Sequence, residues 1–539
     1  MRHHVRGGGG SLVALWAAVV IFFAVCVLVP LCFVALAPRF ADVVSVLTSS
    51  RWHTAMRNTA LVCVCSTVLS VAVGYVYAYA VVRGGIFCAR FFSVVPIAHL
   101  VTPPFVGGLA FILLFGRQGF VTHTLLGLDV SLYGFWGLLL AQTLCFFPIA
   151  YLICAQTLRG ISAGVEQAAR GMGAGRARIF WTITLPLSFP GILGALLFIA
   201  VSVLSDFGNP MIVGGRFRVL AVEIYTQLTG WLNAGTSAVL GLVLVVPSVV
   251  LFVLQNHVLK ASAAKMATVG GKGHGVPRET APVATRVCLT AFCALVSLAV
   301  VAQFAAITAG AFQKLWGVHT AFTFDHVRAL TKYLHELRNS VAFALVSAVC
   351  STLIASLTAY MTHRTALPLR RSLDVVAQLP SAIPGSLFGL AIALAANRLH
   401  FRVSQVLIVI AMTVGFLPFS YRIMSSAYAQ FRTTLDDGAR SLGADRLHVF
   451  GTVLLPLAAG GLFSSFVYTF VRGVGTLSAV IFLVSFKTPL ASVRILNLAE
   501  QGDWGKSAAL ALLLTVVTFM TLGVGRLAIG RLVGRAGGR

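Results

Sequence analysis

The chain has 539 residues, of which 58% are hydrophobic and only 10% are charged, and its formal net charge is +26. A soluble domain carries about a quarter of its residues as charged side chains, so this composition excludes a soluble enzyme or a soluble nucleic-acid-binding protein and indicates an integral membrane protein. The ten cysteines lie in or beside apolar runs, which argues against a disulfide framework or a metal site.

Apolar runs long enough to cross a bilayer recur along the whole chain. A membrane helix needs roughly 20 mostly apolar residues, and we predict about twelve such spans. The fold class is therefore all-α integral membrane. The predicted spans lie near residues 12–37, 59–82, 92–116, 133–157, 187–205, 237–259, 285–311, 340–361, 374–396, 404–428, 459–484 and 508–528.

The two halves of the chain repeat each other. Arg57-Asn58-Thr59 opens the second span, and Arg338-Asn339-Ser340 opens the eighth. Pro103, Gly108 and Leu109 recur at the same spacing as Pro384, Gly389 and Leu390. One half is thus a copy of the other with edited loops.

Two basic, glycine-containing blocks interrupt the apolar runs, at residues 165–192 and 434–462. They align without a gap, so that Gln167 matches Asp437 and Gly173 matches Gly443. Carboxylates favour the positive end of a helix dipole, and Glu166, Asp436 and Asp437 stand where a short helix would begin. Alanines after them keep that helix thin enough to dock closely against a partner.

The glycines and prolines of each block predict its shape. Gly173 and Gly443 are placed where a helix would end in a left-handed residue. Pro186 and Pro456 suit the first turn of the next apolar helix, where no backbone donor is lost. Each block is therefore predicted to be a helix, a sharp turn and a second helical piece.

Six predicted spans separate the two blocks, so both face the same side and the repeat is parallel. Lys and Arg are richer on that side, which by the positive-inside rule places the blocks and both termini in the cytoplasm. Residues 260–286 are rich in Gly, Ala and Lys and predict a flexible cytoplasmic linker. It would join a first half, residues 1–259, to a second half, residues 287–539.

Asp206 is the ionisable residue that most needs an explanation, because it stands at the end of the fifth span. A charge inside the bilayer is costly and usually faces a cavity or a partner. Asp206 and Asn209 match the region of Thr476 and Ser478 in the second half, which predicts a polar translocation path. The alternative is an aspartate outside the membrane that caps the following segment.

Catalytic motifs are missing from the sequence. Gly505-Lys506-Ser507 resembles the end of a phosphate-binding loop, but Glu500 occupies the position of its first glycine. The thirteen histidines show no metal-binding spacing. We expect a non-catalytic chain that binds no metal and no cofactor of its own.

The two blocks resemble the EAA loop of the membrane subunits of ATP-binding-cassette importers. The shared pattern is an alanine pair, a glycine four residues on, and a later Leu-Pro. The first copy has Gln167 where the family has Glu, and the second has Asp437-Gly438 for Glu-Ala. In that family the loop forms a coupling helix that docks on a cytoplasmic ATPase. The resemblance implies ATPase-coupling roles for Glu166, Gln167, Ala168, Ala169, Gly173, Leu185, Pro186, Asp436, Asp437, Gly438, Ala439, Gly443, Leu455 and Pro456.

From about Asn58 onward the chain is similar to fused ferric-iron permeases of bacteria, notably at residues 205–210, 222–225, 478–485 and 495–499. The resemblance implies the type I importer permease fold, two six-helix halves, and alternating access in the bacterial inner membrane. Ferric iron is the expected cargo. Thiamine, phosphonate, sulfate or a polyamine are alternatives within the class, and a secondary transporter driven by an ion gradient is the alternative outside it.

The same resemblance implies the partners. Two copies of a cytoplasmic ATPase would bind ATP and Mg, an extracytoplasmic protein would deliver the substrate, and the lipid bilayer would surround the spans. No nucleic acid is expected.

Overall fold

The computed structural model describes residues 7–128, 130, 132–269, 282–365, 367–432 and 434–536. Almost every element in these ranges is helical, which confirms the all-α prediction. The strands present are β1 (Gln313–Leu315) and β2 (His319–Phe322), which form an antiparallel hairpin.

The first half contains helices that follow the apolar runs. They are α1 (Gly7–Phe23), η1 (Ala24–Leu28), α2 (Val29–Leu36), α3 (Phe40–Thr48), α4 (Ser50–Val82), α5 (Ala89–Val101), α6 (Pro104–Phe115), η2 (Phe120–Leu125), α7 (Phe135–Gly160), α8 (Ala163–Gly171), α9 (Arg176–Ile179), η3 (Phe180–Thr184), α10 (Leu185–Leu204), α11 (Gly208–Val213), α12 (Leu220–Thr229) and α13 (Ala234–Val269).

The second half repeats this order. Its helices are α14 (Val283–Phe312), α15 (Asp325–Ala329), η4 (Leu330–Tyr333), α16 (Leu334–Arg364), α17 (Arg370–Gln378), η5 (Leu379–Ala382), α18 (Gly385–Arg398), α19 (Ser404–Ala429), α20 (Thr434–Ser441), α21 (Arg446–Val449), η6 (Phe450–Leu454), α22 (Leu455–Leu457), α23 (Ala459–Val474), α24 (Ala491–Glu500) and α25 (Trp504–Ala536).

Within the described ranges, nine helices are long and apolar enough to cross a membrane, or up to 12 if each bent pair counts as one span. The spans predicted at 92–116 and 374–396 correspond to two of the bent pairs. Each is a pair of helices bent by 108°, and the bends fall at Pro103 and Pro384. Proline cannot donate a helical hydrogen bond, and it forces the preceding residue into an extended conformation; Thr102 and Ile383 both adopt it.

Three other predicted boundaries also differ. The span predicted at 187–205 begins earlier, because helical structure runs continuously from Arg176 to Leu204. The span predicted at 459–484 ends at Val474, and its helix is bent by 75° from the preceding piece, Arg446–Leu457. In the region of the linker predicted at 260–286, α13 continues to Val269 and α14 begins at Val283; residues 270–281 lie outside the described residues.

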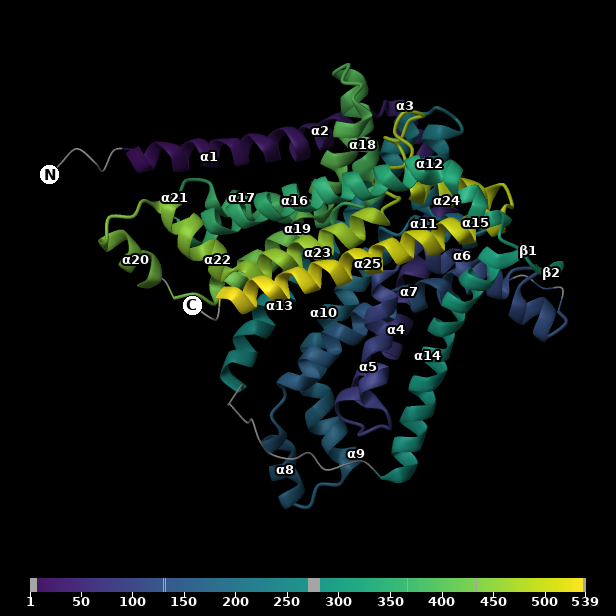
Figure 1. Cartoon of the computed structure of the whole chain (residues 1–539), viewed down its shortest axis with the longest axis horizontal. Helices are drawn as coiled ribbons and strands as arrows, with labels where there is room; N and C mark the ends of the chain where they lie inside the picture. Colours follow the sequence, from purple (N-terminus) through teal and green to yellow (C-terminus); the bar gives the residue numbers. More distant parts are fainter. Residues whose placement is uncertain are drawn as a thin grey trace.

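The halves diverge from a shared end. In Figure 1 the first-half helices α4, α5, α7 and α10 run down toward α8 and α9, and the second-half helices α16, α19 and α23 run left toward α20 and α21. The opposite end holds α12, α24, α15 and the β1–β2 hairpin, and we call it the convergent end. Both α8 and α20 lie at the free ends of the diverging halves, away from the convergent end (Figure 1).

The first span of each half packs against helices of the other half. The segment α2 packs against α18, and α14 packs against α6. The Trp316 indole donates a hydrogen bond of 3.0 Å to the Leu113 carbonyl across the same boundary. The two halves of the chain therefore form one helical core together.

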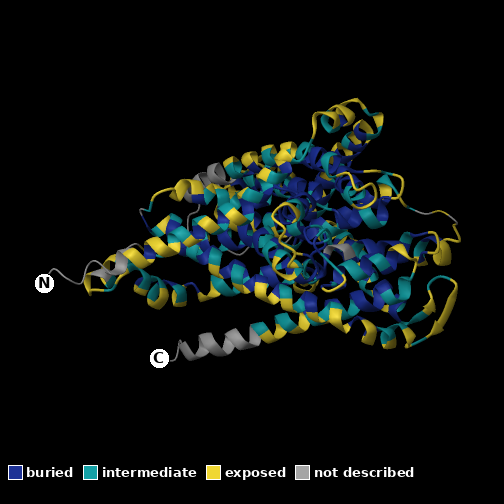
Figure 2. Cartoon of the chain, turned by 90° about the horizontal axis from the view of Figure 1, so that it is seen from above, coloured by how far each residue is buried: buried dark blue, intermediate teal, exposed yellow. Residues whose placement is uncertain are grey.

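Burial follows position in the bundle. Figure 2 shows buried residues gathered in the centre and exposed residues along the outer helices and their ends. In an 18-residue apolar window of Phe135–Gly160, 67% of the window is buried within the protein. The corresponding share for Val283–Phe312, which exposes Leu295 and Leu298, is only 28%. Apolar side chains on such an outer helix suit contact with lipid.

Candidate coupling and translocation sites

The blocks at residues 165–192 and 434–462, which we call the coupling segments after their predicted role, have the shape that their sequence predicts. In the first, α8 ends at Gly171 and the chain reverses at Gly173, whose φ is +85°. The Gly173 amide donates to the Arg170 carbonyl and the Ala174 amide donates to the Ala169 carbonyl. This pair of bonds is the Schellman motif that satisfies the last carbonyls of a helix. Gly443 repeats the turn with φ +90°.

The predicted prolines lie next to irregular helical turns. Pro186 follows the π-helical η3 and Pro456 follows the π-helical η6. A π turn already departs from the regular hydrogen-bond ladder, so a residue without an amide proton costs less there. In the first half the helix continues through Pro186, whereas in the second it breaks at Ala458.

The structure separates the predicted coupling residues into two groups. Those on the outer surface of the segments are Gln167, Ala168, Gly173, Pro186, Asp437, Gly438, Gly443 and Pro456. Those turned at least partly toward the body of the protein are Glu166, Ala169, Leu185, Asp436, Ala439 and Leu455. The first group is available to a docking partner.

Sequence reasoning missed the most exposed apolar residues of both segments. Met172 is 83% exposed and Leu442 is 91% exposed, and each directly precedes the glycine of its turn. The two residues hold equivalent positions in the gap-free alignment. A large apolar residue repeated before each turn glycine could therefore have been noticed in the sequence. A large apolar side chain held in solvent at the tip of a turn is suited to insertion into a partner's groove.

Asp206 lies between α10 and α11 and is held by amides. Its carboxylate accepts hydrogen bonds from the Gln142 side chain at 3.0 Å and from the Asn209 side chain at 2.9 Å. It also accepts from the Asn209 backbone amide at 3.3 Å. Ser66 extends this chain by donating to Gln142. Asp206 therefore both caps the first turn of α11 and joins a polar network among helices.

Thr476 and Ser478 occupy the matching region of the second half but do not join this network through any described hydrogen bond. The Thr476 carbonyl accepts a hydrogen bond of 2.7 Å from Ser492. Ser478 packs on Gly385, where an added Cβ would lie 2.6 Å from the serine oxygen. The predicted pair is thus asymmetric, with an amide-bound carboxylate on one side and hydroxyl groups on the other.

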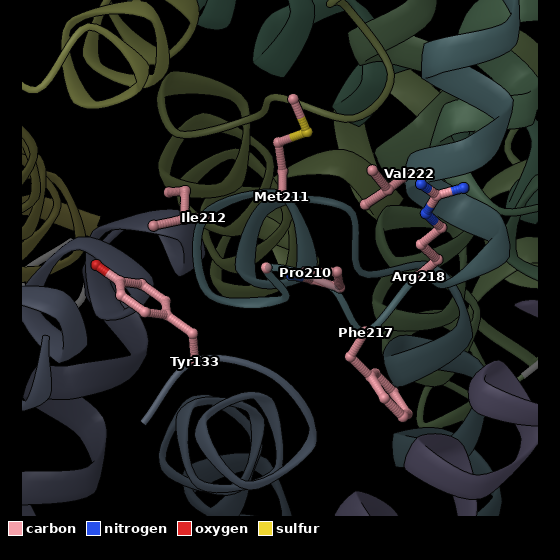
Figure 3. A pocket seen from close by; sticks show the side chains of 8 residues that line it. Tyr133, Pro210, Met211, Ile212, Phe217, Arg218 and Val222 are labelled. Carbon is pink, nitrogen blue, oxygen red and sulfur yellow. The ribbon is translucent and has the colours of Figure 1, made fainter. Parts of the chain in front are cut away.

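A cavity of about 330 Å³ lies just beyond Asn209 (Figure 3). Its lining is mostly apolar, with the Arg218 guanidinium and the Tyr133 hydroxyl directed to different sides of α11. Arg218 lies 3.7 Å from Glu223, which is itself paired with Arg51 at 2.7 Å. The lining residues are Tyr133, Pro210, Met211, Ile212, Gly215, Phe217, Arg218 and Val222.

Among the described residues, no group of three or more His, Cys, Asp and Glu could hold a metal ion.

The repeated Arg-Asn-Thr and Arg-Asn-Ser motifs each place a hydroxyl group at the start of a short helix. The Thr59 hydroxyl accepts a 2.9 Å hydrogen bond from the Leu220 amide at the start of α12. The Ser340 hydroxyl accepts an equal bond from the Ala491 amide at the start of α24. Each motif thus satisfies an amide at a helix start, and fixes a short helix of the convergent end.

Comparisons with known proteins agree with this architecture. The family described as "binding-protein-dependent transport system inner membrane component" matches residues 66–262 and 351–533, one segment in each half. The ferric transport system permease protein FbpB of Actinobacillus pleuropneumoniae is 30% identical over 445 residues, which are 80% of this chain and 64% of that protein. This chain therefore spans slightly less than two thirds of the length of that relative.

Of two further relatives, one is named as a ferric transport permease and the other as a molybdenum transport permease. A putative ferric transport system permease protein FbpB 1 of Haemophilus influenzae is 30% identical, over 78% of this chain and 68% of the relative. The molybdenum transport system permease protein ModB of Escherichia coli K12 is 38% identical over 136 residues, 24% of this chain and 59% of the relative. With both halves matched, the chain belongs to the family of inner membrane components of binding-protein-dependent transport systems.

Proposed function

We propose that this chain is the permease of an ATP-driven, binding-protein-dependent importer in the bacterial inner membrane. The observation that carries the proposal is the pair of coupling segments, which repeat the same turn at the same end of two diverging halves (Figure 1). Each segment offers an exposed surface and an apolar tip to a partner. A partner that binds both tips could change the angle between the halves.

The proposed partners follow from the family and from the two segments. Two copies of a cytoplasmic ATPase, one for each segment, would supply ATP and Mg, and this chain would bind neither. An extracytoplasmic substrate-binding protein would dock at the convergent end, where the β1–β2 hairpin exposes Leu315 and Phe322. We propose that both termini lie in the cytoplasm, on the same side as the coupling segments.

The mechanism we propose is alternating access. Closure of the ATPase pair would draw α8 and α20 together, and the halves would then separate at the convergent end to accept cargo. ATP hydrolysis would return them to the diverging arrangement. The polar group at Asp206 would provide a transient contact for the cargo during this cycle.

Ferric iron is the cargo we propose, since two relatives that match most of this chain are named as ferric transport permeases. Similarity to molybdenum permeases over a shorter stretch makes an oxyanion the second candidate. The cargo is testable on the binding protein that works with this permease. Thermal stabilisation of that protein by ferric iron and not by molybdate is the expected result, and the reverse would overturn the cargo assignment.

The coupling proposal is testable with variants at the two tips. We expect Met172→Asp together with Leu442→Asp to lower co-purification of the ATPase at least tenfold and to abolish uptake in proteoliposomes, because a carboxylate replaces each apolar contact. Leu232→Asp is the matched control, since Leu232 is 84% exposed and lies between α12 and α13, away from both tips. A double change at the alanines that face the body of the protein, Ala169→Glu with Ala439→Glu, should also abolish uptake.

Uptake that persists in either double variant would reject the assignment of the coupling segments. Uptake that persists without ATP would reject the coupling assignment as well, and it would support a secondary transporter driven by an ion gradient.

A further inference from the structure

One buried arginine lies at the end of the long second helix of each half. Arg83 follows α4 and Arg364 ends α16, and both side chains are only 4% exposed. They are equivalent residues of the repeat, at the same spacing as Asn58 and Asn339. A buried guanidinium is retained only where it is paired and hydrogen-bonded, so each needs a structural reason.

The first arginine binds three parts of its half at once. One terminal nitrogen of Arg83 forms an ion pair with Glu166 of α8. The other terminal nitrogen donates to the Leu158 carbonyl at 2.8 Å and to the Ile161 carbonyl at 3.1 Å. Arg83 therefore connects the end of α4, the end of α7 and the coupling helix.

The second arginine makes the same contacts. One terminal nitrogen of Arg364 lies 3.1 Å from the Asp436 carboxylate of α20. The other donates to the Tyr428 carbonyl at 2.6 Å and to the Phe431 carbonyl. Each of these partners is the repeat equivalent of a partner of Arg83. Two halves with different side chains have thus kept one geometry.

The chemistry of the contact requires arginine. The last carbonyls of a helix have no partner within it, and the negative end of the helix dipole attracts a cation. A planar guanidinium can serve two carbonyls and a carboxylate together, whereas a lysine ammonium is a compact point charge without that fork. The carboxylate then neutralises the buried charge.

Among the described elements, the coupling helices α8 and α20 pack mainly on the elements that follow them directly in the chain, which are α9 and η3 for α8 and α21 for α20. The arginine contacts add a connection from each coupling helix back to the two spans that precede it.

We propose that Arg83 and Arg364 are positioning residues that transmit movement of the coupling helices to the transmembrane helices. We call each arginine with its carboxylate a coupling clamp. The inference rests on the proposed function. The ATPase would dock on the outer surface of α8 and α20. The clamps, on the side of α8 and α20 that faces the body of the protein, would pull the transmembrane helices along when α8 and α20 move.

The two clamps differ in one respect. The Thr184 hydroxyl donates a further hydrogen bond of 3.1 Å to Glu166, but the equivalent second-half residue is Leu454. One oxygen of Asp436 is buried without a hydrogen-bond partner among the described residues. We therefore expect the first clamp to hold more firmly, and Arg83→Gln to impair transport more than Arg364→Gln.

The test measures cargo transported per ATP hydrolysed by the full complex in proteoliposomes. The double variant Arg83→Gln, Arg364→Gln should co-purify with the ATPase at the wild-type level but lower this ratio at least ~5-fold, the lower bound for a typical coupling free energy. The matched control is Arg90→Gln with Arg371→Gln, which removes the same charge from exposed side chains. Arg83→Lys with Arg364→Lys should restore only part of the ratio.

Each outcome separates the two proposals. If the wild-type complex shows no ATP-dependent uptake, the proposed function fails. If the wild-type complex transports and the Gln double variant has an unchanged ratio, the clamp inference fails. Should that variant not fold, Glu166→Gln with Asp436→Asn keeps the hydrogen-bond acceptors and removes the ion pairs, and an unchanged ratio there would overturn the inference equally.

Discussion

Gly173 and Gly443 set the direction in which each coupling segment turns. At both sites a Cβ would meet no other atom within 4 Å, so the left-handed backbone, and not crowding, is what favours glycine. A residue with a side chain costs roughly 1–2 kcal/mol in that conformation.

This cost predicts a specific defect at the turn. Gly173→Ala with Gly443→Ala should weaken ATPase binding, by roughly tenfold if 1.4 kcal/mol of turn strain must be overcome on docking. The measurement is the dissociation constant of the ATPase for the detergent-purified permease. Gly171→Ala is the control, because Gly171 also has open space but ends α8 without a positive φ. Equal effects of the two changes would contradict the role of the turn.

At this scale the sequence predicts backbone features better than side-chain partners. The turns at Gly173 and Gly443 are confirmed, because conformational preference is local. The side chains of Glu166 and Asp436, which are predicted for ATPase coupling, contact Arg83 and Arg364, and the sequence did not indicate these partners. Those arginines are distant in sequence, and only the packing of α4 beside α7, and of α16 beside α19, brings them close.

Among the elements, the bent pairs α5–α6 and α17–α18 depart most from the prediction. The hydropathy of each segment is high along its whole length, so the sequence predicts one continuous span in each place. The signal is present in Pro103 and Pro384, which the repeat alignment already pairs. A proline bends a membrane helix sharply only where neighbouring groups can form hydrogen bonds with the backbone groups that the bend frees. Whether such neighbours are present depends on tertiary packing, which the sequence does not show.

The bend at Pro103 makes a tight contact with the other half. A Cβ at Gly475 would lie 2.5 Å from the Pro103 Cβ, closer than real side chains approach. Gly475→Ala should therefore destabilise the protein by about 1–3 kcal/mol and lower its thermal midpoint in detergent. Gly415→Ala, in open space within α19, is the control. A midpoint for Gly475→Ala equal to that of the control would show that the halves do not meet there.

For the whole molecule, composition and internal repeats predict a duplicated helical protein, and the family match agrees. The exchange of α2 and α14 between the halves could not be predicted, because nothing local records which half an apolar helix will contact. The division into two permease halves remains a proposal that the exchange supports.

That division predicts that the connection between α13 and α14 is dispensable for assembly. Residues 1–269 and 282–539, expressed together as separate chains, should co-purify, because α2 packs on α18 and α14 packs on α6. An affinity tag on one chain and detection of the other would measure this. Recovery of the tagged chain alone would contradict the proposed division.

The central claim is that both coupling segments face one side of the membrane, where a single motor can reach them. It is tested most directly by labelling Met172→Cys and Leu442→Cys with a membrane-impermeant maleimide, in a background with exposed Cys32, Cys88 and Cys288 changed to serine. We predict that both positions react in inside-out vesicles and neither in right-side-out vesicles, while Leu232→Cys shows the opposite pattern. Reaction of Met172→Cys and Leu442→Cys from opposite sides would contradict the account.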